Sequence, residues 1–408
     1  MTNPDGTLLE INSGNLPERI PEDEAGRMAS KGSDLTYEST DYECRHFEKE
    51  DMEILVFVSS AERQDSDSPR RISELLLKEH PEIRQVWAFT EPEKFRFLEE
   101  KGIKVVKYKS LQYLYYVMTS KVYVDNAEFW SALKFRPGQM VLETWHGGGA
   151  YKKVGGHRID VNAREQQHAV EKMNKITLFL SSSKAFTDFV IRDAYQYRGE
   201  VLECGLPRND ELLRPDPATA AKVRKALDIP AGAKVLIYAP TFRNSHSLDL
   251  YDVDFGALKG ALEKRFGGEW VIVLRMHYYL AHKAMASSAP YLRNATDYPD
   301  MQELLQCADV LLTDYSSCMW DFSLMHRPCF LYARDIAEYR GERDFYTPIE
   351  SWPFPLAADN AELVKIIEGF DEATYRAAVD RHHAQLGSTE SGTAARQCVD
   401  RIVKYLNN

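Results

Sequence analysis

The stretch EILVFVSSAERQDSDSPRRISELLLKEHPEIRQVWAF, residues 53–89, contains a complete strand–helix–strand pattern. Residues 53–60 and 82–89 are short apolar runs typical of buried strands. Between them, residues 68–80 begin with a serine that can cap a helix and a proline at the first helical position, and apolar residues follow at helical spacing. This order predicts two parallel strands joined by a crossover helix.

The same alternation continues along the rest of the chain. The further predicted helices are 92–102, 110–120 and 184–196, and the further predicted strands are 103–108, 121–125, 139–145, 176–183 and 200–205. A second series of strands follows at 234–242, 270–277, 310–317 and 328–333, and an amphipathic helix spans 393–406. The pattern predicts an α/β protein with two Rossmann-like, doubly wound sheets.

We divide the chain into four parts. Residues 1–50 are polar and rich in Gly, Pro, Asp and Glu, so we expect a flexible N-terminal extension. Residues 51–212 and 213–390 are the two Rossmann-like domains, and residues 391–408 are the C-terminal helix. Ligands of such sheets bind beyond the carboxyl ends of the strands, so the polar residues at those ends are the functional candidates.

Composition excludes several classes of protein. The 408 residues carry a formal net charge of −11, which argues against non-specific nucleic-acid binding but allows a local basic site for a phosphorylated ligand. No run of eighteen apolar residues is present, so we expect no membrane span, and the first residues lack the pattern of a secretory signal, so we expect none. The six cysteines form no CxxC pair, and we interpret them as reduced core residues of a cytoplasmic protein.

The sequence TWHGGGAYKKVGG, residues 144–156, places His146 at the end of a predicted strand. The adjoining Gly147 and Gly148 let backbone N–H groups approach a ligand, and a neutral imidazole can accept a proton near pH 7. His146 is therefore a candidate general base, and a histidine that supports a glycine turn is the alternative. Lys152 and Lys153 either bind phosphate or face solvent.

The sequence GLPRND, residues 205–210, also follows a predicted strand. The guanidinium of Arg208 can contact a phosphate through two N–H groups. Asn209 and Asp210 are equally typical of a turn at a domain hinge. Both interpretations remain open from the sequence.

Two strand ends of the second domain carry polar residues that suit a diphosphate. YAPTFR, residues 238–243, and VLRMH, residues 273–277, end predicted strands. The candidates are Thr241 and Arg243 in the first stretch, and Arg275 and His277 in the second. Residues two apart on a strand share a face, so the side chains of Arg275 and His277 can contact one ligand.

The sequence TDYSSCMWDF, residues 313–322, carries the strongest local signal. A strand ends at Thr313 and Asp314, and Ser316 and Ser317 then open a helix. The N–H groups, hydroxyls and macrodipole at such a helix start can bind a diphosphate, and ordinary serine capping is the alternative. Asp321, one turn further on, is either a ligand residue or the partner of a local cap.

Several common catalytic motifs are absent from the sequence. It has no GxxxxGK[ST] phosphate loop, no GxGxxG leading from a strand into a helix, and no GxSxG nucleophile turn. No DxD pair lies at a strand end, and the spacing of His and Asp suggests no metal site, so we expect no metal and no other cofactor.

Six motifs in this order resemble the CDP-glycerol glycerophosphotransferase family, the polymerases and primases of teichoic acids and related capsule polymers. They are TWHGGGAYKKVG, GLPRND, YAPTFR, TDYSSCMWDF, RPCFLYARDIAEYRGERDFY and ESGTAAR. The resemblance covers residues 50–405. It implies a GT-B-like architecture in which an acceptor domain, residues 51–212, and a CDP-donor domain, residues 213–390, face a cleft. It also implies a metal-independent enzyme that is peripheral to the inner face of the cell membrane.

The resemblance also implies roles for individual residues. His146 matches the family's catalytic base, and His277 matches a second histidine near the donor diphosphate. Taking the motifs and the resemblance together, we group with the donor Arg243, Thr241, Arg275, Thr313, Asp314, Ser316, Ser317 and Asp321. On the same grounds we group with the cleft and the acceptor Gly147, Gly148, Lys152, Lys153, Arg208, Asn209 and Asp210.

The implied reaction moves glycerol phosphate, or a related polyol phosphate, from CDP-glycerol to a hydroxyl of a lipid-linked saccharide or a polyol-phosphate polymer, and releases CMP. No nucleic acid takes part. A GT-B nucleotide-sugar glycosyltransferase and a non-catalytic nucleotide-binding relative are the alternatives. The sequence departs from the family at WHGGG, where the family often has WHGT, so the acceptor contacts are expected to differ. Residues 94–110 mix cations with aromatics and either contact lipid headgroups or form a solvated face.

Overall fold

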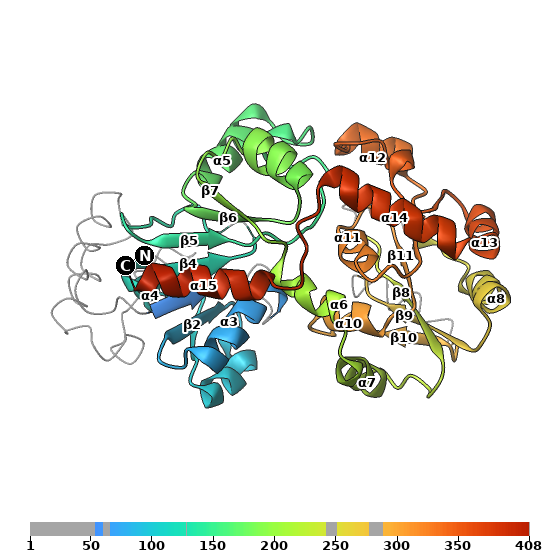
Figure 1. The fold of residues 1–408 in the computed structure, drawn as a ribbon, viewed down its shortest axis with the longest axis horizontal. Helices are drawn as coiled ribbons and strands as arrows, with labels where there is room; N and C mark the ends of the chain where they lie inside the picture. Colours follow the sequence, from blue (N-terminus) through green and yellow to red (C-terminus); the bar gives the residue numbers. More distant parts are fainter. Residues whose placement is uncertain (1–53, 60–65, 128, 242–250, 277–288, 408) are drawn as a thin grey trace, which may run out of the picture. The chain divides into compact units, whose positions relative to one another are not determined.

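The computed structural model describes residues 54–59, 66–127, 129–241, 251–276 and 289–407. The predicted N-terminal extension, residues 1–50, therefore lies outside the described residues. Two parallel sheets form the framework of the molecule (Figure 1). The prediction of an α/β protein with two Rossmann-like sheets is confirmed.

The first sheet has seven strands in the order β3-β2-β1-β4-β5-β6-β7. The pairs β1–β2, β2–β3, β1–β4 and β4–β5 are parallel. The chain turns from one half of the sheet to the other between β1 and β4, as in a doubly wound fold. The strands are β1 (Ile54–Phe57), β2 (Arg84–Phe89), β3 (Lys104–Lys107), β4 (Val122–Asp125), β5 (Met140–Glu143), β6 (Leu178–Ser181) and β7 (Glu200–Glu203).

The second sheet has six strands in the order β10-β9-β8-β11-β12-β13, and all five neighbouring pairs are parallel. It repeats the same switch of direction, here between β8 and β11. The strands are β8 (Lys234–Tyr238), β9 (Trp270–Leu274), β10 (Leu292–Asn294), β11 (Val310–Thr313), β12 (Cys329–Tyr332) and β13 (Leu356–Ala357). The sequence did not predict β10 and β13, which have three and two residues.

The helices begin and end where local capping chemistry places them. In α5 (Ala163–Met173), Asn162 and Glu165 form a reciprocal capping box. The predicted helix 92–102 is a 3₁₀ helix, η3 (Pro92–Lys101), which Gly102 ends in a left-handed conformation. The predicted helix 184–196 is a π-helix, η5 (Phe186–Ala194).

The other helices occupy the connections between strands or follow the last strand. Before the second sheet they are α3 (Asp67–Glu79), α4 (Leu111–Thr119), η4 (Gly155–His157), η6 (Pro207–Asn209), α6 (Asp210–Leu213) and α7 (Pro217–Ala226). Within and after it they are α8 (Phe255–Phe266), α10 (Met301–Cys307), α11 (Cys318–Ser323), α12 (Ile336–Glu342), η8 (Ile349–Ser351), α13 (Asn360–Glu368), α14 (Glu372–Leu386) and α15 (Ala394–Leu406).

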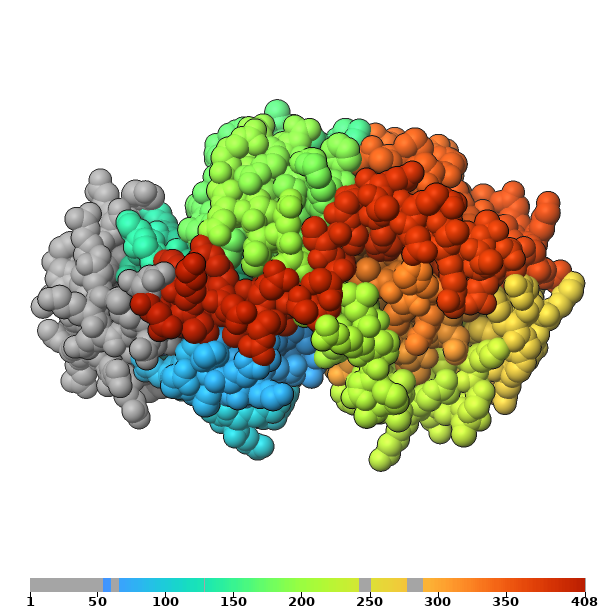
Figure 2. All heavy atoms as spheres, viewed as in Figure 1, coloured from blue at the N-terminus to red at the C-terminus, as the bar shows by residue number. Residues whose placement is uncertain are grey.

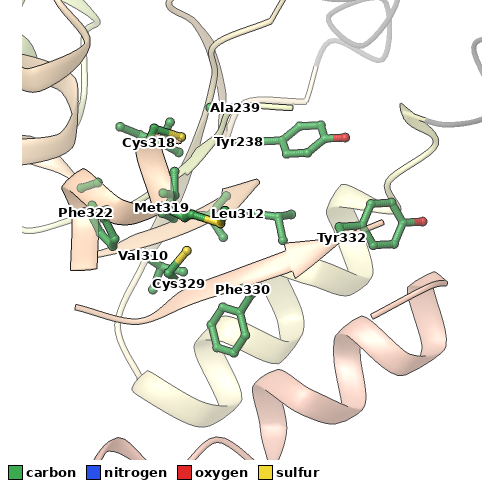
Figure 3. Packing of buried hydrophobic residues seen from close by; sticks show 14 of the residues in the cluster. Tyr238, Ala239, Val310, Leu312, Cys318, Met319, Phe322, Cys329, Phe330 and Tyr332 are labelled. Atoms are coloured by element: carbon green, nitrogen blue, oxygen red, sulfur yellow. The ribbon is translucent and has the colours of Figure 1, made fainter. Parts of the chain in front are cut away.

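The core of the second sheet is apolar and fully buried. Side chains of β11 and β12, such as Leu312 and Phe330, pack with Met319 and Phe322 of α11 (Figure 3). Burial of these apolar side chains away from water is the main favourable contribution to the free energy of folding. The short helix α11 is therefore held firmly at the carboxyl end of β11, where the sequence predicted a ligand.

Contacts divide the described chain into two compact units. One contains the residues up to Trp145, Lys175–Leu178 and the segment from Arg396 onward, and the other contains His146–Asn174 and Phe179–Ala395. In the first unit, helix α15 lies beside α3, where Arg396 forms an ion pair with Glu79 (Figures 1 and 2). The candidate site residues that the structure describes all belong to the second unit.

Candidate active site

His146 is an exposed residue on a strained turn. Strand β5 ends at Glu143, three residues earlier, and Trp145 has a left-handed backbone with φ of 57°. A bulky side chain rarely adopts this conformation, so the surrounding structure must hold it. One holding contact is the Glu143 carboxylate, whose Oε1 accepts a hydrogen bond of 2.9 Å from the Trp145 N–H. The buried turn thus presents the next residue, His146, at the surface.

The glycines that follow are needed for close packing. We call residues 146–149 the His146 loop. A Cβ atom on Gly148 would lie 1.9 Å from Cδ1 of Trp320, so only glycine fits against this buried indole. Gly149 has φ of 68°, and its N–H donates to Oγ of Ser182 at 3.2 Å. The backbone of the loop is therefore fixed on both sides.

Replacing Gly148 with alanine is expected to displace the Trp320 indole or the loop. Overpacking of this kind costs about 1–3 kcal/mol, which lowers the melting temperature by about 2–12 °C. Thermal unfolding of the full chain measures the effect. Gly341→Ala is the matched control, because a Cβ there would meet nothing within 4 Å. Equal melting temperatures for the two variants would contradict the packing role.

Arg208 holds the same loop through its backbone. Its Nη1 donates to the carbonyl oxygen of His146 at 2.7 Å, and its Nη2 lies 2.8 Å from Oδ2 of Asp321. Both partners of this ion pair are buried, and Oδ2 of Asp321 also accepts from Nε2 of Gln302 at 3.1 Å. The sequence left Asp321 open as a ligand residue or as the partner of a local cap, and in the structure its carboxylate forms an ion pair with Arg208.

Asn209 takes part in a neighbouring contact. Its Nδ2 donates to Oε1 of Glu390 at 2.8 Å, and Nε1 of Trp320 donates to the same oxygen at 3.0 Å. The other oxygen, Oε2, accepts from the N–H of Leu206 at 3.0 Å. Sequence reasoning assigned no role to Glu390, Trp320 or Gln302, although the first two lie inside the motifs ESGTAAR and TDYSSCMWDF.

Asp314 holds the segment that follows β8. Its buried carboxylate accepts from the backbone N–H of Thr241 at 2.9 Å and from Oγ1 of Thr241 at 2.6 Å. Thr313 makes a parallel contact, because its Oγ1 donates to the carbonyl of Ala239 at 2.7 Å. The structure thus brings together the carboxyl ends of β8 and β11, with Thr241, Thr313 and Asp314 at their junction.

Ser316 and Ser317 lie directly after this junction, before α11. Ser317 is the residue before the first helical position, and its hydroxyl makes no capping hydrogen bond. Oγ of Ser316 receives a long contact of 3.5 Å from the N–H of Cys318, and its side chain also contacts the thiol of that residue. Because α11 has six residues, its macrodipole is small, and the local N–H groups and hydroxyls are what this turn offers an anion.

Three other candidates are engaged elsewhere. Nζ of Lys153 lies 2.6 Å from Oδ2 of Asp344. The Asp210 carboxylate accepts from the first N–H groups of α15, those of Ala394 and Ala395, at 2.9 and 2.8 Å. Arg275 donates to the carbonyls of Ala295 and Thr296, and burial lowers the pKa of its guanidinium.

The remaining candidates are placed as follows. Lys152 is half-buried and forms a backbone bridge with Phe345, and Gly147 is buried. Arg243 and His277 lie outside the described residues.

Among the described residues, no three His, Cys, Asp or Glu side chains come together in a way that could hold a metal ion. None of the helices in the same part of the chain is both long and apolar enough to cross a lipid bilayer.

Comparison with known proteins identifies similar chains. A family model described as CDP-glycerol:poly(glycerophosphate) glycerophosphotransferase matches residues 41–404. The teichoic acid glycerol-phosphate transferase of Staphylococcus aureus is 28% identical over 367 residues, which cover 86% of this chain and 93% of that protein. The teichoic acid poly(glycerol phosphate) polymerase of Staphylococcus epidermidis is 28% identical over 364 residues, covering 86% of this chain and 50% of the polymerase. The chain thus spans about half the length of this polymerase and of its Bacillus subtilis counterpart.

Solved structures give the same result for the fold. A histidine-to-asparagine variant of the wall teichoic acid polymerase TagF matches with a TM-score of 0.78 and 27% identity, covering 90% of this chain and 92% of that one. The same kind of variant soaked with CDPG matches with a TM-score of 0.76. These likenesses confirm the predicted GT-B-like fold. Because the family model covers most of its length, the chain belongs to the CDP-glycerol:poly(glycerophosphate) glycerophosphotransferase family.

Proposed function

We propose that the chain transfers glycerol phosphate, or a related polyol phosphate, from CDP-glycerol to a hydroxyl group of a lipid-linked or polymer acceptor in teichoic acid or capsule synthesis. Family membership supports the reaction class. The observation that carries the proposal is the exposed His146 on a loop that a buried arginine and a buried indole hold in place. A general base must lie within hydrogen-bond reach of the proton that it takes, and a fixed backbone beneath an exposed imidazole helps to hold it there.

In the proposed reaction, the acceptor oxygen attacks the β-phosphorus of CDP-glycerol. A new oxygen–phosphorus bond forms, and the bond from that phosphorus to the bridging oxygen breaks. CMP leaves with the bridging oxygen, and the imidazole of His146 takes the proton of the acceptor hydroxyl. Phosphoryl transfer depends mainly on positioning and on stabilising charge, so preorganised donors supply most of the catalysis.

On the donor side, we propose that the turn at Ser316 and Ser317 binds the diphosphate. This proposal is supported by the Ser317 hydroxyl, which makes no capping hydrogen bond to α11. It follows the carboxyl end of β11, next to the hydrogen bond between Thr241 and Asp314. Arg243 and His277 are assigned to the same role by their places at the ends of predicted strands and by the family resemblance. In this proposal Asp314 and Asp321 are positioning residues, because both carboxylates already accept hydrogen bonds from the protein.

We also propose that the reaction needs no divalent metal and takes place at the inner face of the cell membrane. Arginine, serine and backbone N–H donors can neutralise a dividing diphosphate without a metal ion when they are preorganised. The location follows from the lipid-linked acceptor in the proposed reaction.

Product analysis of the full chain tests the function. The chain is incubated with CDP-glycerol, CDP-ribitol or a UDP-sugar and a synthetic lipid-linked acceptor, with and without EDTA, and products are identified by mass spectrometry. We expect release of CMP, addition of polyol phosphate to the acceptor, and no effect of EDTA. Release of UDP with transfer of a sugar would establish the glycosyltransferase alternative, and donor binding without product would establish a non-catalytic relative.

A further inference from the structure

Glu390 occupies the connection between α14 and α15, and its carboxylate receives three hydrogen bonds from distant parts of the sequence. Oε1 accepts from Nδ2 of Asn209 at 2.8 Å and from Nε1 of Trp320 at 3.0 Å. Oε2 accepts from the N–H of Leu206 at 3.0 Å. Three donors and two oxygens match a carboxylate, because an ionised carboxyl group only accepts hydrogen bonds.

The backbone beside Glu390 is shaped to admit this carboxylate. Gly205 has φ of 86°, and a Cβ atom on it would lie 2.5 Å from Oε2 of Glu390 and 3.0 Å from its Cα. Any other residue at position 205 would push the carboxylate away from the N–H of Leu206. The glycine thus serves the contact with Glu390 as well as the turn after β7.

The indole of Trp320 transmits the position of Glu390 to the His146 loop. Trp320 is fully buried, and the backbone of Gly148 packs directly against the ring atoms that include Nε1. The atom that donates to Glu390 is therefore also an atom that Gly148 touches. If the indole rotates away from Glu390, the loop loses its packing surface.

A second route runs through η6. Asn209, which donates to Glu390, is the neighbour of Arg208, whose guanidinium donates to the carbonyl of His146. Both routes from the Glu390 carboxylate therefore end at the His146 loop, one through packing and the other through a hydrogen bond.

We propose that Glu390 is a positioning residue for the transfer reaction, which acts through Trp320 and Asn209 to fix the loop that carries His146. This inference rests on the function proposed above. The carboxylate of Glu390 is occupied by its three protein donors, so its effect on the reaction is exerted through the loop.

Charge makes this role dependent on pH. Burial raises the pKa of Glu390 to about 7, and the nearby Asp321 carboxylate acts in the same direction, while the three hydrogen bonds act against it. The other charged or titratable groups nearby are Arg208, paired with Asp321, Asp210, which binds the start of α15, and His383. Burial lowers the pKa of His383 to about 4, so this ring stays neutral near pH 7.

The sign of the effect follows from this pKa. The folded state favours the protonated carboxyl group, so the contribution of Glu390 to stability is full at low pH and is lost as pH rises through about 7. Over the same range the carboxylate becomes ionised, and hydrogen bonds to an ionised acceptor are shorter and stronger. The contact with Trp320 therefore tightens as pH rises.

Nuclear magnetic resonance of the indole N–H group tests the contact directly. The full chain is labelled with ¹⁵N-tryptophan, and the Trp320 signal is assigned by its loss in Trp320→Phe. We expect this signal to titrate with a midpoint near pH 7 in the wild type, to stop titrating in Glu390→Gln, and to titrate still in His146→Asn. A wild-type signal that does not move between pH 5.5 and 8.5, values chosen to bracket a pKa of about 7, would overturn the pH dependence, and a Trp320 signal at the same position in Glu390→Gln as in the wild type would overturn the contact itself.

Kinetics test the consequence. With CDP-glycerol, Glu390→Gln is expected to lower kcat by about 10- to 100-fold with little change in the donor KM, and to flatten the limb of the pH profile near 7. Glu390→Asp, which keeps the charge, is expected to recover part of the loss. Glu338→Gln, on an exposed position of α12, is the matched control and should behave as the wild type.

The two proposals fail in different ways. A wild-type chain that transfers nothing from CDP-glycerol or CDP-ribitol would remove the proposed function, while the indole titration would still test the contact of Glu390 with Trp320. A wild-type chain that is active, with Glu390→Gln at the same kcat and pH profile, would remove only the role of Glu390.

Discussion

Replacing His146 with alanine is expected to lower kcat by about 10²–10⁴-fold, the usual loss when a positioned general base is removed. The fold should survive, because the residue is exposed and because the contact with Arg208 uses its backbone carbonyl, which alanine keeps. Donor KM should change little, since the imidazole is proposed to act on the acceptor hydroxyl. Steady-state kinetics with CDP-glycerol and thermal unfolding measure the two halves of the prediction.

His168→Ala is the matched control for this experiment. His168 is also an exposed histidine of the second unit, and it lies on α5. We expect its variant to keep wild-type turnover and melting temperature. If His146→Ala keeps more than a tenth of wild-type turnover, His146 is not the base, and the mechanism proposed above is wrong on that point.

The fold could be predicted from the sequence because its signals are local. Every strand of the first sheet and four strands of the second coincide with apolar runs identified from sequence alone. The two missed strands, β10 and β13, have three and two residues, too few for a pattern to appear. The type of each helix was harder to predict from the sequence. The apolar residues of the 3₁₀ helix at 92–101 and of the π-helix at 186–194 have the same spacing as those of an α-helix.

The partners of the candidate residues could not be predicted in the same way. Lys153 pairs with Asp344, which is 191 positions away, and Arg208 binds Asp321, 113 positions away. Spacing along the chain says nothing about such pairs, because the fold alone brings them together. For this reason the sequence left Lys153, Asp210 and Asp321 with two interpretations each.

Glu390 illustrates the limit most clearly. It lies in a recognisable motif, ESGTAAR, but its three partners lie between 70 and 184 positions earlier in the chain. One sequence signal points toward this site, namely Gly205 in GLPRND. The structure explains why a glycine is required there, because a Cβ atom at this position would collide with the Glu390 carboxylate. Sequence motifs thus indicate the regions of the site, and tertiary contacts define the roles of residues within them.

Removing the Asp321 carboxylate is expected to destabilise the second unit by about 3–5 kcal/mol, because Asp321→Ala leaves the Arg208 guanidinium buried without its counter-charge. Thermal unfolding should show a fall in melting temperature of about 6–20 °C. Glu368→Ala is the matched control. It breaks the ion pair of 2.6 Å between Glu368 and Lys264, in which the lysine side chain is 68% exposed, and should cost less than about 1 kcal/mol. Similar losses for the two variants would contradict the importance of burial.

A double variant separates stability from positioning. Arg208→Met with Asp321→Leu replaces the buried pair by apolar side chains of similar length, a change that is often neutral for stability because no buried charge remains. We therefore expect it to recover most of the stability lost in Asp321→Ala. Turnover should nevertheless stay low, because the His146 carbonyl has lost the donor that holds it at 2.7 Å. A double variant that is both stable and fully active would show that the ion pair supports the fold alone, and that the position of His146 is set by the packing of Gly148 on Trp320.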